Sequence, residues 1–213
     1  MLLEPNKYSV MCITRDGLPL SHEEQAERLC EAGARWIQLR MKEAAPKDWI
    51  NTACAVREIC RSHGAVCIVN DSVDIAIAAA ADGVHLGGED EKWSEARRRM
   101  GRGMLLGGTV NNEKDARRAI RANCLDYIGV GPWRFTETKK NLAPVLGPAG
   151  VRLLVAMLDG MPVWVIGGLE PADLPEVRTT GAMGVAVASG LFRNGSLDTN
   201  FKTYAAAWAG EAV

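Results

Sequence analysis

The stretch Gln38-Leu39-Arg40-Met41-Lys42 places an amide and two cations at alternate positions. In a β-strand, alternate side chains point to the same face, so Gln38, Arg40 and Lys42 would project together. Guanidinium, ammonium and amide donors suit the oxygens of a phosphate or diphosphate. Burying this pattern without an anion would be costly, which favours an anion site over a solvated rim.

Acidic groups follow the next two apolar stretches of the chain. Asn70 and Asp71 follow one of them, and Asp90 follows the run that contains His85. Mg²⁺ prefers a couple of carboxylates together with water and substrate phosphates, so Asp71 and Asp90 predict a Mg²⁺ site. His85 has no second His or Cys at metal spacing, and we expect a structural or substrate-contacting residue there instead of a zinc ligand.

The segment YIGVGPWRFTETKKNLAPVLG, residues 127–147, begins as an apolar strand and then loses all hydrophobic periodicity. Loops of this length are uncommon in compact domains unless they have a function. Thr136, Thr138 and Lys139 supply two hydroxyls and a cation in this loop. We predict that it covers the site and orders on its ligands.

These residues must be positioned by eight short apolar runs that alternate with amphipathic stretches. The runs cover residues 8–14, 35–40, 65–70, 83–87, 104–110, 126–131, 163–168 and 184–189. Between the first two runs, Ser21 and Glu24 form a capping box, and Gly33 is the stop signal of the predicted helix. Strands that alternate with helices imply parallel pairing through crossovers.

Eight such units predict an α/β fold, a single (β/α)8 TIM barrel over residues 1–213, with its site at the C-terminal ends of the strands. A doubly wound sheet is the runner-up, but no G-x-G-x-x-G follows the first run. Thr109 would add a hydroxyl at the barrel mouth. Gly168, Ala188 and Ser189 follow the last two runs, where this fold often binds phosphate through backbone N–H groups.

Composition narrows the class of protein. The chain has 213 residues, is 47% hydrophobic and 24% charged, and carries a formal net charge of -1. We therefore expect small-molecule substrates as partners, no nucleic acid and no membrane, and neither a signal peptide nor a membrane span is visible. The six cysteines form no Cys-x-x-Cys pair and indicate buried thiols in a reducing, cytoplasmic compartment. A homo-oligomer is compatible with the sequence.

Six motifs together resemble one known family. They occur in the family's order between about residues 8 and 192, and they read WIQLRMK, VNDSVDIAIAAAADGVHLGGED, LLGGTV, DYIGVGPWRFTETKK, VIGGL and GVAVASG. The chain is similar to the thiamine-phosphate synthase (thiamine-phosphate pyrophosphorylase) family. The resemblance implies a (β/α)8 barrel enzyme of thiamine biosynthesis, a transferase that joins hydroxymethylpyrimidine diphosphate to thiazole phosphate and releases diphosphate. It also implies Mg²⁺ as the cofactor.

The resemblance assigns roles position by position. The cations implied to act on the diphosphate as catalytic residues are Arg40, Lys42 and Lys139. The residues implied to bind Mg²⁺ are Asp71 and Asp90. The residues implied to contact the two substrates are Gln38, Leu39, Arg40, Met41, Lys42, Asn70, His85, Thr109, Thr136, Glu137, Thr138, Lys139, Gly168, Ala188 and Ser189. Those implied to hold the thiazole phosphate are Thr136, Thr138, Gly168, Ala188 and Ser189.

Two positions depart from the family's usual pattern. Thr109 stands where the family more usually has Ser, and it keeps the hydroxyl. Trp133-Arg134-Phe135 stands where an apolar residue, Phe and Pro usually precede the first loop threonine. The added cation of Arg134 either approaches the phosphorylated substrates or faces solvent, and the sequence leaves both open.

The sequence offers no Ser/His/Asp set, no cysteine nucleophile and no mid-strand lysine for a Schiff base. A dissociative substitution needs none of them, because the thiazole nitrogen carries no proton to remove. A thiazole tautomerase of the same fold would need a general acid and base, and could dispense with the metal and the cations. A non-catalytic phosphate-binding barrel would have no use for a metal at a leaving group. The acid pair and the cations favour the synthase.

Overall fold

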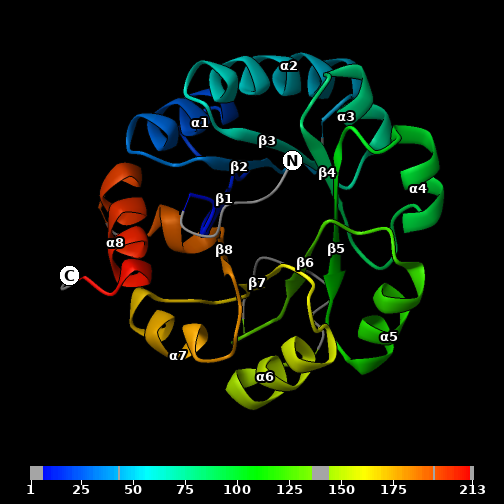
Figure 1. The fold of residues 1–213 in the computed structure, drawn as a ribbon. Coiled ribbons are helices and arrows are strands. Elements are labelled where there is room, and N and C mark those ends of the chain that lie inside the picture. Colours follow the sequence, from blue (N-terminus) through cyan, green and yellow to red (C-terminus); the bar gives the residue numbers. More distant parts are fainter. Residues whose placement is uncertain (1–6, 43, 136–143, 194, 212–213) are drawn as a thin grey trace.

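The computed structural model describes residues 7–42, 44–135, 144–193 and 195–211, and its parallel strands close into a ring surrounded by helices (Figure 1). Consecutive strands pair with each other, and β8 closes the ring on β1. The strands are β1 (Val10–Ile13), β2 (Trp36–Leu39), β3 (Val66–Asn70), β4 (Gly83–Leu86), β5 (Leu105–Val110), β6 (Tyr127–Val130), β7 (Val163–Ile166) and β8 (Gly184–Val187). The predicted (β/α)8 barrel is confirmed, and the doubly wound sheet is excluded.

Helices return the chain from each strand to the next along the outside of the ring. They are α1 (His22–Glu31), α2 (Pro46–Ser62), α3 (Val73–Ala78), α4 (Trp93–Met100), α5 (Glu113–Ala122), α6 (Gly147–Met157), α7 (Leu174–Arg178) and α8 (Leu197–Ala209). Two 3₁₀ turns, η1 (Pro171–Asp173) and η2 (Ser189–Phe192), follow β7 and β8. The predicted capping box is present, because Ser21 accepts from the Glu24 N–H at 3.1 Å and donates its own N–H to Glu24 at 2.7 Å.

Each predicted apolar run contains one observed strand, and the strands are shorter than the runs. The run 35–40 contains β2, and the run 163–168 contains β7, which ends at Ile166. The terminal residues of the runs leave the backbone ladder and enter the loops. Arg40, Lys42, Gly168 and Ser189 consequently lie just beyond the ends of their strands.

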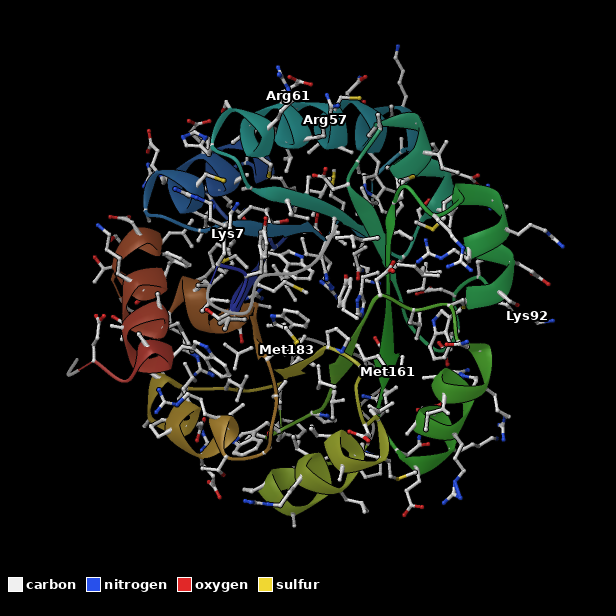
Figure 2. The ribbon with its side chains drawn as sticks, in the orientation of Figure 1. Lys7, Arg57, Arg61, Lys92, Met161 and Met183 are labelled. Atoms are coloured by element: carbon white, nitrogen blue, oxygen red, sulfur yellow. The ribbon has the colours of Figure 1, made fainter. Side chains whose placement is uncertain are left out.

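Aromatic side chains fill the N-terminal half of the barrel interior. Tyr8, Trp36, Tyr127 and Trp164 are buried there, with ring centroids 4.8 to 6.0 Å apart. The Trp164 indole N–H donates to the Tyr8 carbonyl at 2.9 Å. Figure 2 shows side chains filling the space inside the ring. The interior is a packed core and not a channel, as this fold requires.

Carboxylates tie neighbouring strands together at their N-terminal ends. The Cys67 N–H at the start of β3 donates to Asp82, just before β4, at 2.8 Å. The Leu106 N–H of β5 donates to Asp126, just before β6, at 2.7 Å. These acceptors take up N–H groups near the beginnings of the strands, which would be expensive to bury unpaired.

All six cysteines are free thiols. Cys12, Cys30, Cys60 and Cys67 are buried, and burial raises the pKa of the Cys12 thiol, which confirms the prediction for these four. The prediction of burial is wrong for Cys54 of α2 and for Cys124 in the loop between α5 and β6, which pack against the core but are only half-buried. Among the residues that the structure describes, no helix combines the length and the apolar character that a membrane span requires.

Candidate active site

The C-terminal half of the barrel interior, which we call the mouth, is lined by polar side chains. Gln38, Asn70 and Thr109 alternate with outward-facing apolar residues of their strands and are 3%, 7% and 7% exposed. The Gln38 amide nitrogen lies 3.3 Å from the Met11 sulfur. The structure therefore confirms the predicted inward orientation of Gln38, and it supplies polar groups above the aromatic core.

His85 connects β5 and β6 across the mouth. Its Nδ1 lies 3.1 Å from the Tyr127 hydroxyl, and its Nε2 lies 2.9 Å from the Thr109 hydroxyl. Burial raises the pKa of Tyr127 well above its usual value, so this hydroxyl keeps its proton and can donate to Nδ1. A Cβ at Gly107 would lie 2.1 Å from the Tyr127 ring, so only glycine leaves room for this contact. His85 thus orients the Thr109 hydroxyl.

The acid pair and Lys42 meet where β2, β3 and β4 end. The backbone of Asp71 is left-handed, with φ of 68°, and its N–H donates to the His85 carbonyl at 2.8 Å. The Lys42 ammonium contacts the Asp71 carboxylate. Asp90 accepts from the Gly87 N–H at 2.6 Å. The structure therefore brings together the two predicted metal ligands and one predicted cation.

The electrostatics of this cluster favour a bound cation. Burial raises the pKa of Asp90, the Gly87 N–H lowers it, the neighbouring Asp71 carboxyl raises it further, and the Lys42 ammonium opposes that rise. Two carboxyls that share one ammonium can accept additional positive charge, and oxygen ligands of this kind fit Mg²⁺. In the described part of the chain, no group of three or more His, Cys, Asp or Glu side chains could hold a metal, so the ion would also need substrate oxygens or water.

Arg40 lies just beyond β2, half-buried, and its N–H donates to the Thr14 hydroxyl at 3.2 Å. The neighbouring Leu39 is fully buried between the barrel and the helices, and the half-buried Met41 packs against the same outer core. The side chains of Leu39 and Met41 therefore pack away from the mouth, and any substrate contact there would use their backbone.

The loops after β7 and β8 lie beside each other. The Tyr204 hydroxyl of α8 donates to the Leu169 carbonyl at 2.7 Å and would clash with any side chain at Gly190. Gly168 has a φ of 67°, and a Cβ there would lie 2.8 Å from the Arg134 Cβ. Ala188 and Ser189 are half-buried at the start of η2. The predicted small residues are therefore neighbours, and their phosphate contacts stay a prediction.

Arg134, which the sequence left between two readings, has a third role. Its guanidinium bonds the carboxylate of Asp173 and lies 3.5 Å from Glu170. Its N–H donates to the Gly167 carbonyl at 2.9 Å. Asp173 is nearly buried, and it also caps η1 by accepting from the Glu170 N–H at 2.8 Å. Arg134 therefore attaches the start of the loop after β6 to the loop after β7.

Four predicted site residues lie outside the described residues. These residues are Thr136, Glu137, Thr138 and Lys139. Their roles in phosphate and diphosphate binding stay predictions.

Sequence reasoning missed a group of residues beside the cations. Thr14 and Asp16 accept from the backbone N–H groups of Arg40 and Lys42, and His22 contacts both of these side chains. A signal was present, because polar Thr14 and Asp16 alternate after β1 in the same way that Arg40 and Lys42 alternate after β2.

Comparison with known sequences points to one family. The profile of the family described as thiamine monophosphate synthase matches residues 10–191. A thiamine-phosphate synthase of Bacteroides fragilis is 38% identical over 189 residues, which cover 87% of this chain and 92% of that protein. A thiamine-phosphate synthase of Phocaeicola vulgatus is 35% identical over 195 residues, which cover 90% of this chain and 93% of that protein.

A solved structure with the same arrangement of strands and helices agrees with the sequence matches. The thiamine phosphate pyrophosphorylase from Pyrococcus furiosus superimposes with a TM-score of 0.87 and 29% sequence identity. The alignment covers 97% of this chain and 98% of that one. The similarity therefore extends over the whole barrel, including the strand ends that form the mouth.

Proposed function

This chain belongs to the thiamine monophosphate synthase family, is an enzyme of thiamine biosynthesis, and we propose that it joins hydroxymethylpyrimidine diphosphate to thiazole phosphate with the help of Mg²⁺. The observation that carries the proposal is the cluster of Lys42, Asp71 and Asp90 at the mouth. A diphosphate leaving group needs cations around it, and Arg40 adds a second one nearby. The raised pKa of Asp90 supports the choice of a divalent cation as the third.

The proposed chemistry is a dissociative substitution. The bond between the pyrimidine methylene carbon and the diphosphate oxygen breaks, and its electron pair leaves with the diphosphate. The thiazole nitrogen then donates its lone pair to the methylene carbon and forms the new C–N bond. Arg40 and Lys42 would stabilise the charge that builds on the leaving oxygen. Mg²⁺, when bound, would neutralise part of the diphosphate charge.

The other mouth residues would bind and orient the substrates. Gln38 and Asn70 offer amide groups inside the barrel, and Thr109 offers a hydroxyl that His85 orients. No residue has to remove a proton, because the thiazole nitrogen carries none. This agrees with a mouth whose histidine is engaged by Tyr127 and Thr109.

The decisive test is incubation of the purified protein with both phosphorylated substrates and Mg²⁺. Thiamine phosphate and diphosphate should appear in equal amounts, and a chelator should stop the reaction. Asp71→Ala should lose most of the turnover while the protein stays folded. Asp74→Ala is the matched control, because Asp74 is exposed on α3, where it pairs with Arg99 outside the mouth.

Two results would contradict the proposal. Undiminished turnover in the presence of chelator would remove Mg²⁺ from it. Folded protein that forms no thiamine phosphate would favour the tautomerase of the same fold, which would convert its thiazole substrate without releasing diphosphate. Lys139→Ala should lower turnover at an unchanged melting temperature, and a shifted melting temperature with unchanged turnover would make Lys139 structural.

We further propose that the enzyme works in the cytoplasm. Free thiols at all six cysteines are compatible with a reducing compartment. Size-exclusion chromatography of the active fraction would tell whether the working species is a homo-oligomer.

A further inference from the structure

The backbone of Arg40 and Lys42 is held by side chains that reach over from the β1–α1 segment. The Arg40 N–H donates to the Thr14 hydroxyl at 3.2 Å, and the Lys42 N–H donates to Asp16 Oδ2 at 3.0 Å. In the opposite direction, the Thr14 N–H donates to the Gln38 carbonyl at 3.0 Å. Side chains therefore take over from the backbone where the β1–β2 ladder ends.

This geometry follows from strand periodicity. Alternate N–H groups of a strand point to the same neighbour, so those of Arg40 and Lys42 both face β1. Beyond Ile13 the β1 backbone no longer runs alongside as a strand. Thr14 Oγ1 and Asp16 Oδ2 supply the two acceptors that a longer β1 would have supplied. The two bonds thus fix the backbone of Arg40 and Lys42 beside the β1–α1 segment, from which their side chains can project toward the mouth.

His22 joins the two acceptors to each other. Its Nδ1 lies 2.7 Å from Thr14 Oγ1, and its Nε2 lies 3.1 Å from Asp16 Oδ1. A carboxylate only accepts, so the Nε2 proton faces Asp16 and the Thr14 hydroxyl donates to Nδ1 when the ring is neutral. The His22 side chain is 10% exposed, while that of Asp16 is 41% exposed. The imidazole is therefore the buried link of this group.

The β1–α1 segment is fixed independently of β2. Gln25 of α1 accepts from the Arg15 N–H at 2.9 Å and donates to the carbonyls of Arg15 and Leu20 at 2.9 and 3.0 Å. His22 is the first residue of α1, directly after the Ser21 cap. Thr14 and Asp16 thus project from a segment that is anchored to a helix, which makes them suitable supports for β2.

We propose that Thr14, Asp16 and His22 form a positioning brace, which sets the location of Arg40 and Lys42 for recognition of the diphosphate. The proposal rests on the proposed function, because it concerns the diphosphate site of that reaction. The brace residues are positioning residues that act through the backbone of the two cations. Small displacements of groups that orient a substrate lower rates strongly, by about 100-fold for 1 Å.

The test compares variants that remove one acceptor each. Thr14→Val keeps the shape of the side chain without its hydroxyl, and Asp16→Ala removes the carboxylate. Each should raise the Kd for inorganic diphosphate with Mg²⁺, measured by calorimetry, by about tenfold. This is the lower end of the loss in affinity that follows when a group that orients a ligand is removed. The KM for the pyrimidine diphosphate should rise in parallel, and the KM for thiazole phosphate should stay unchanged. Thr14→Ser keeps the hydroxyl and should restore the wild-type Kd.

Ser21→Ala is the control for stability. It removes the cap of α1 without removing a contact to Arg40 or Lys42, so it should lower the melting temperature and leave the Kd for diphosphate unchanged. The brace is overturned if Thr14→Val and Asp16→Ala bind diphosphate like wild type, or if both KM values rise together as the melting temperature falls.

The same experiments separate the brace from the proposed function. Wild-type protein that binds diphosphate but forms no thiamine phosphate would overturn the synthase assignment. The brace could still be tested in that case, by comparing the Kd for diphosphate of the variants with that of wild type. Wild-type protein that binds no diphosphate would overturn both.

Discussion

Asp90 is a carboxyl at the mouth whose surroundings disfavour its charged form. It is partly buried, lies beside Asp71, and has a pKa above its usual value for these reasons. The Gly87 N–H and the Lys42 ammonium compensate only in part. A group in this position is unfavourable for the protein alone and favourable for a protein that binds a cation.

We predict that Asp90→Asn stabilises the Mg²⁺-free protein and removes most of its turnover. Because the pKa of Asp90 is raised on folding, folding takes up a proton, and stability falls as pH rises from about 4 through the raised pKa. Asparagine avoids this loss and keeps an oxygen for the Gly87 N–H. Thermal melts should therefore show a higher melting temperature for the variant at about pH 8, and a smaller difference near pH 4.

Glu89→Gln is the matched control, because Glu89 is exposed one residue away. It should leave both the melting temperature and the turnover unchanged. Equal melting temperatures of wild type and Asp90→Asn at both pH values would contradict the assigned environment of Asp90.

At the residue scale, the sequence predicts which way a side chain points better than it predicts which residue that side chain contacts. Alternation along a strand was enough to place Gln38 inside the barrel, because the period of a strand is two residues. It could not pair Arg134 with Asp173, which are 39 residues apart and meet only when β6 and β7 lie side by side. The Tyr127 contact of His85 has the same origin, since 42 residues separate them.

At the scale of elements, several strand pairs are prolonged beyond their ladders. The brace prolongs the pairing of β1 and β2, as described above. After β6, the N–H groups of Trp133 and Arg134 donate to the carbonyls of Ile166 and Gly167, both at 2.9 Å. The positions of the strands were predictable from apolar runs, although not their exact ends, and the capping box was predictable from Ser21 and Glu24. The extension after β6 was not predictable, because its loop residues carry no periodic signal, whereas the brace had one in the alternation of Thr14 and Asp16.

We predict that Arg134→Ala raises the KM for thiazole phosphate several-fold and leaves the KM for the pyrimidine diphosphate almost unchanged. The side chain joins the loops after β6 and β7 through Asp173 and Glu170, and Gly168 of the second loop is a predicted phosphate contact. Steady-state kinetics with each substrate varied in turn would measure the two constants.

Arg193→Ala provides the comparison for Arg134. Arg193 lies 3.1 Å from Glu170, and both side chains of this pair are more than half exposed. Exposed ion pairs contribute about 0 to 1 kcal/mol, so this variant should behave like wild type in both assays. Unchanged kinetics of Arg134→Ala would show that the loops hold their positions without the ion pair.

At the scale of the whole molecule, the two ends of the barrel differ in the groups that they contain. The N-terminal ends of the strands hold the aromatic core and the tying carboxylates, and the C-terminal ends hold the acid pair and the cations. The closed barrel was predictable by counting eight strand–helix units, because crossovers force parallel neighbours and eight of them can close. The roles of individual carboxylates at each end depend on register between strands, which no count of units supplies.

This division predicts opposite outcomes for Asp82, which precedes β4, and Asp71, which follows β3. Asp82→Ala leaves the Cys67 N–H without its acceptor and should lower the free energy of unfolding by about 1 to 3 kcal/mol, because an orphaned backbone donor loses its solvation as well. Thermal or urea denaturation would measure this loss. Well below the melting temperature, kcat and both KM values should match wild type, since Asp82 lies at the end of the barrel away from the mouth.

Asp82→Asn keeps an acceptor oxygen and should recover most of the lost stability, whereas Asp71→Asn, which tolerates the left-handed backbone at that position, should retain stability and lose turnover. A fall in kcat of Asp82→Ala at temperatures where the protein is fully folded would contradict the division. It would mean that the packing of the aromatic core transmits strain from the N-terminal ends of the strands to His85, which contacts that core through Tyr127.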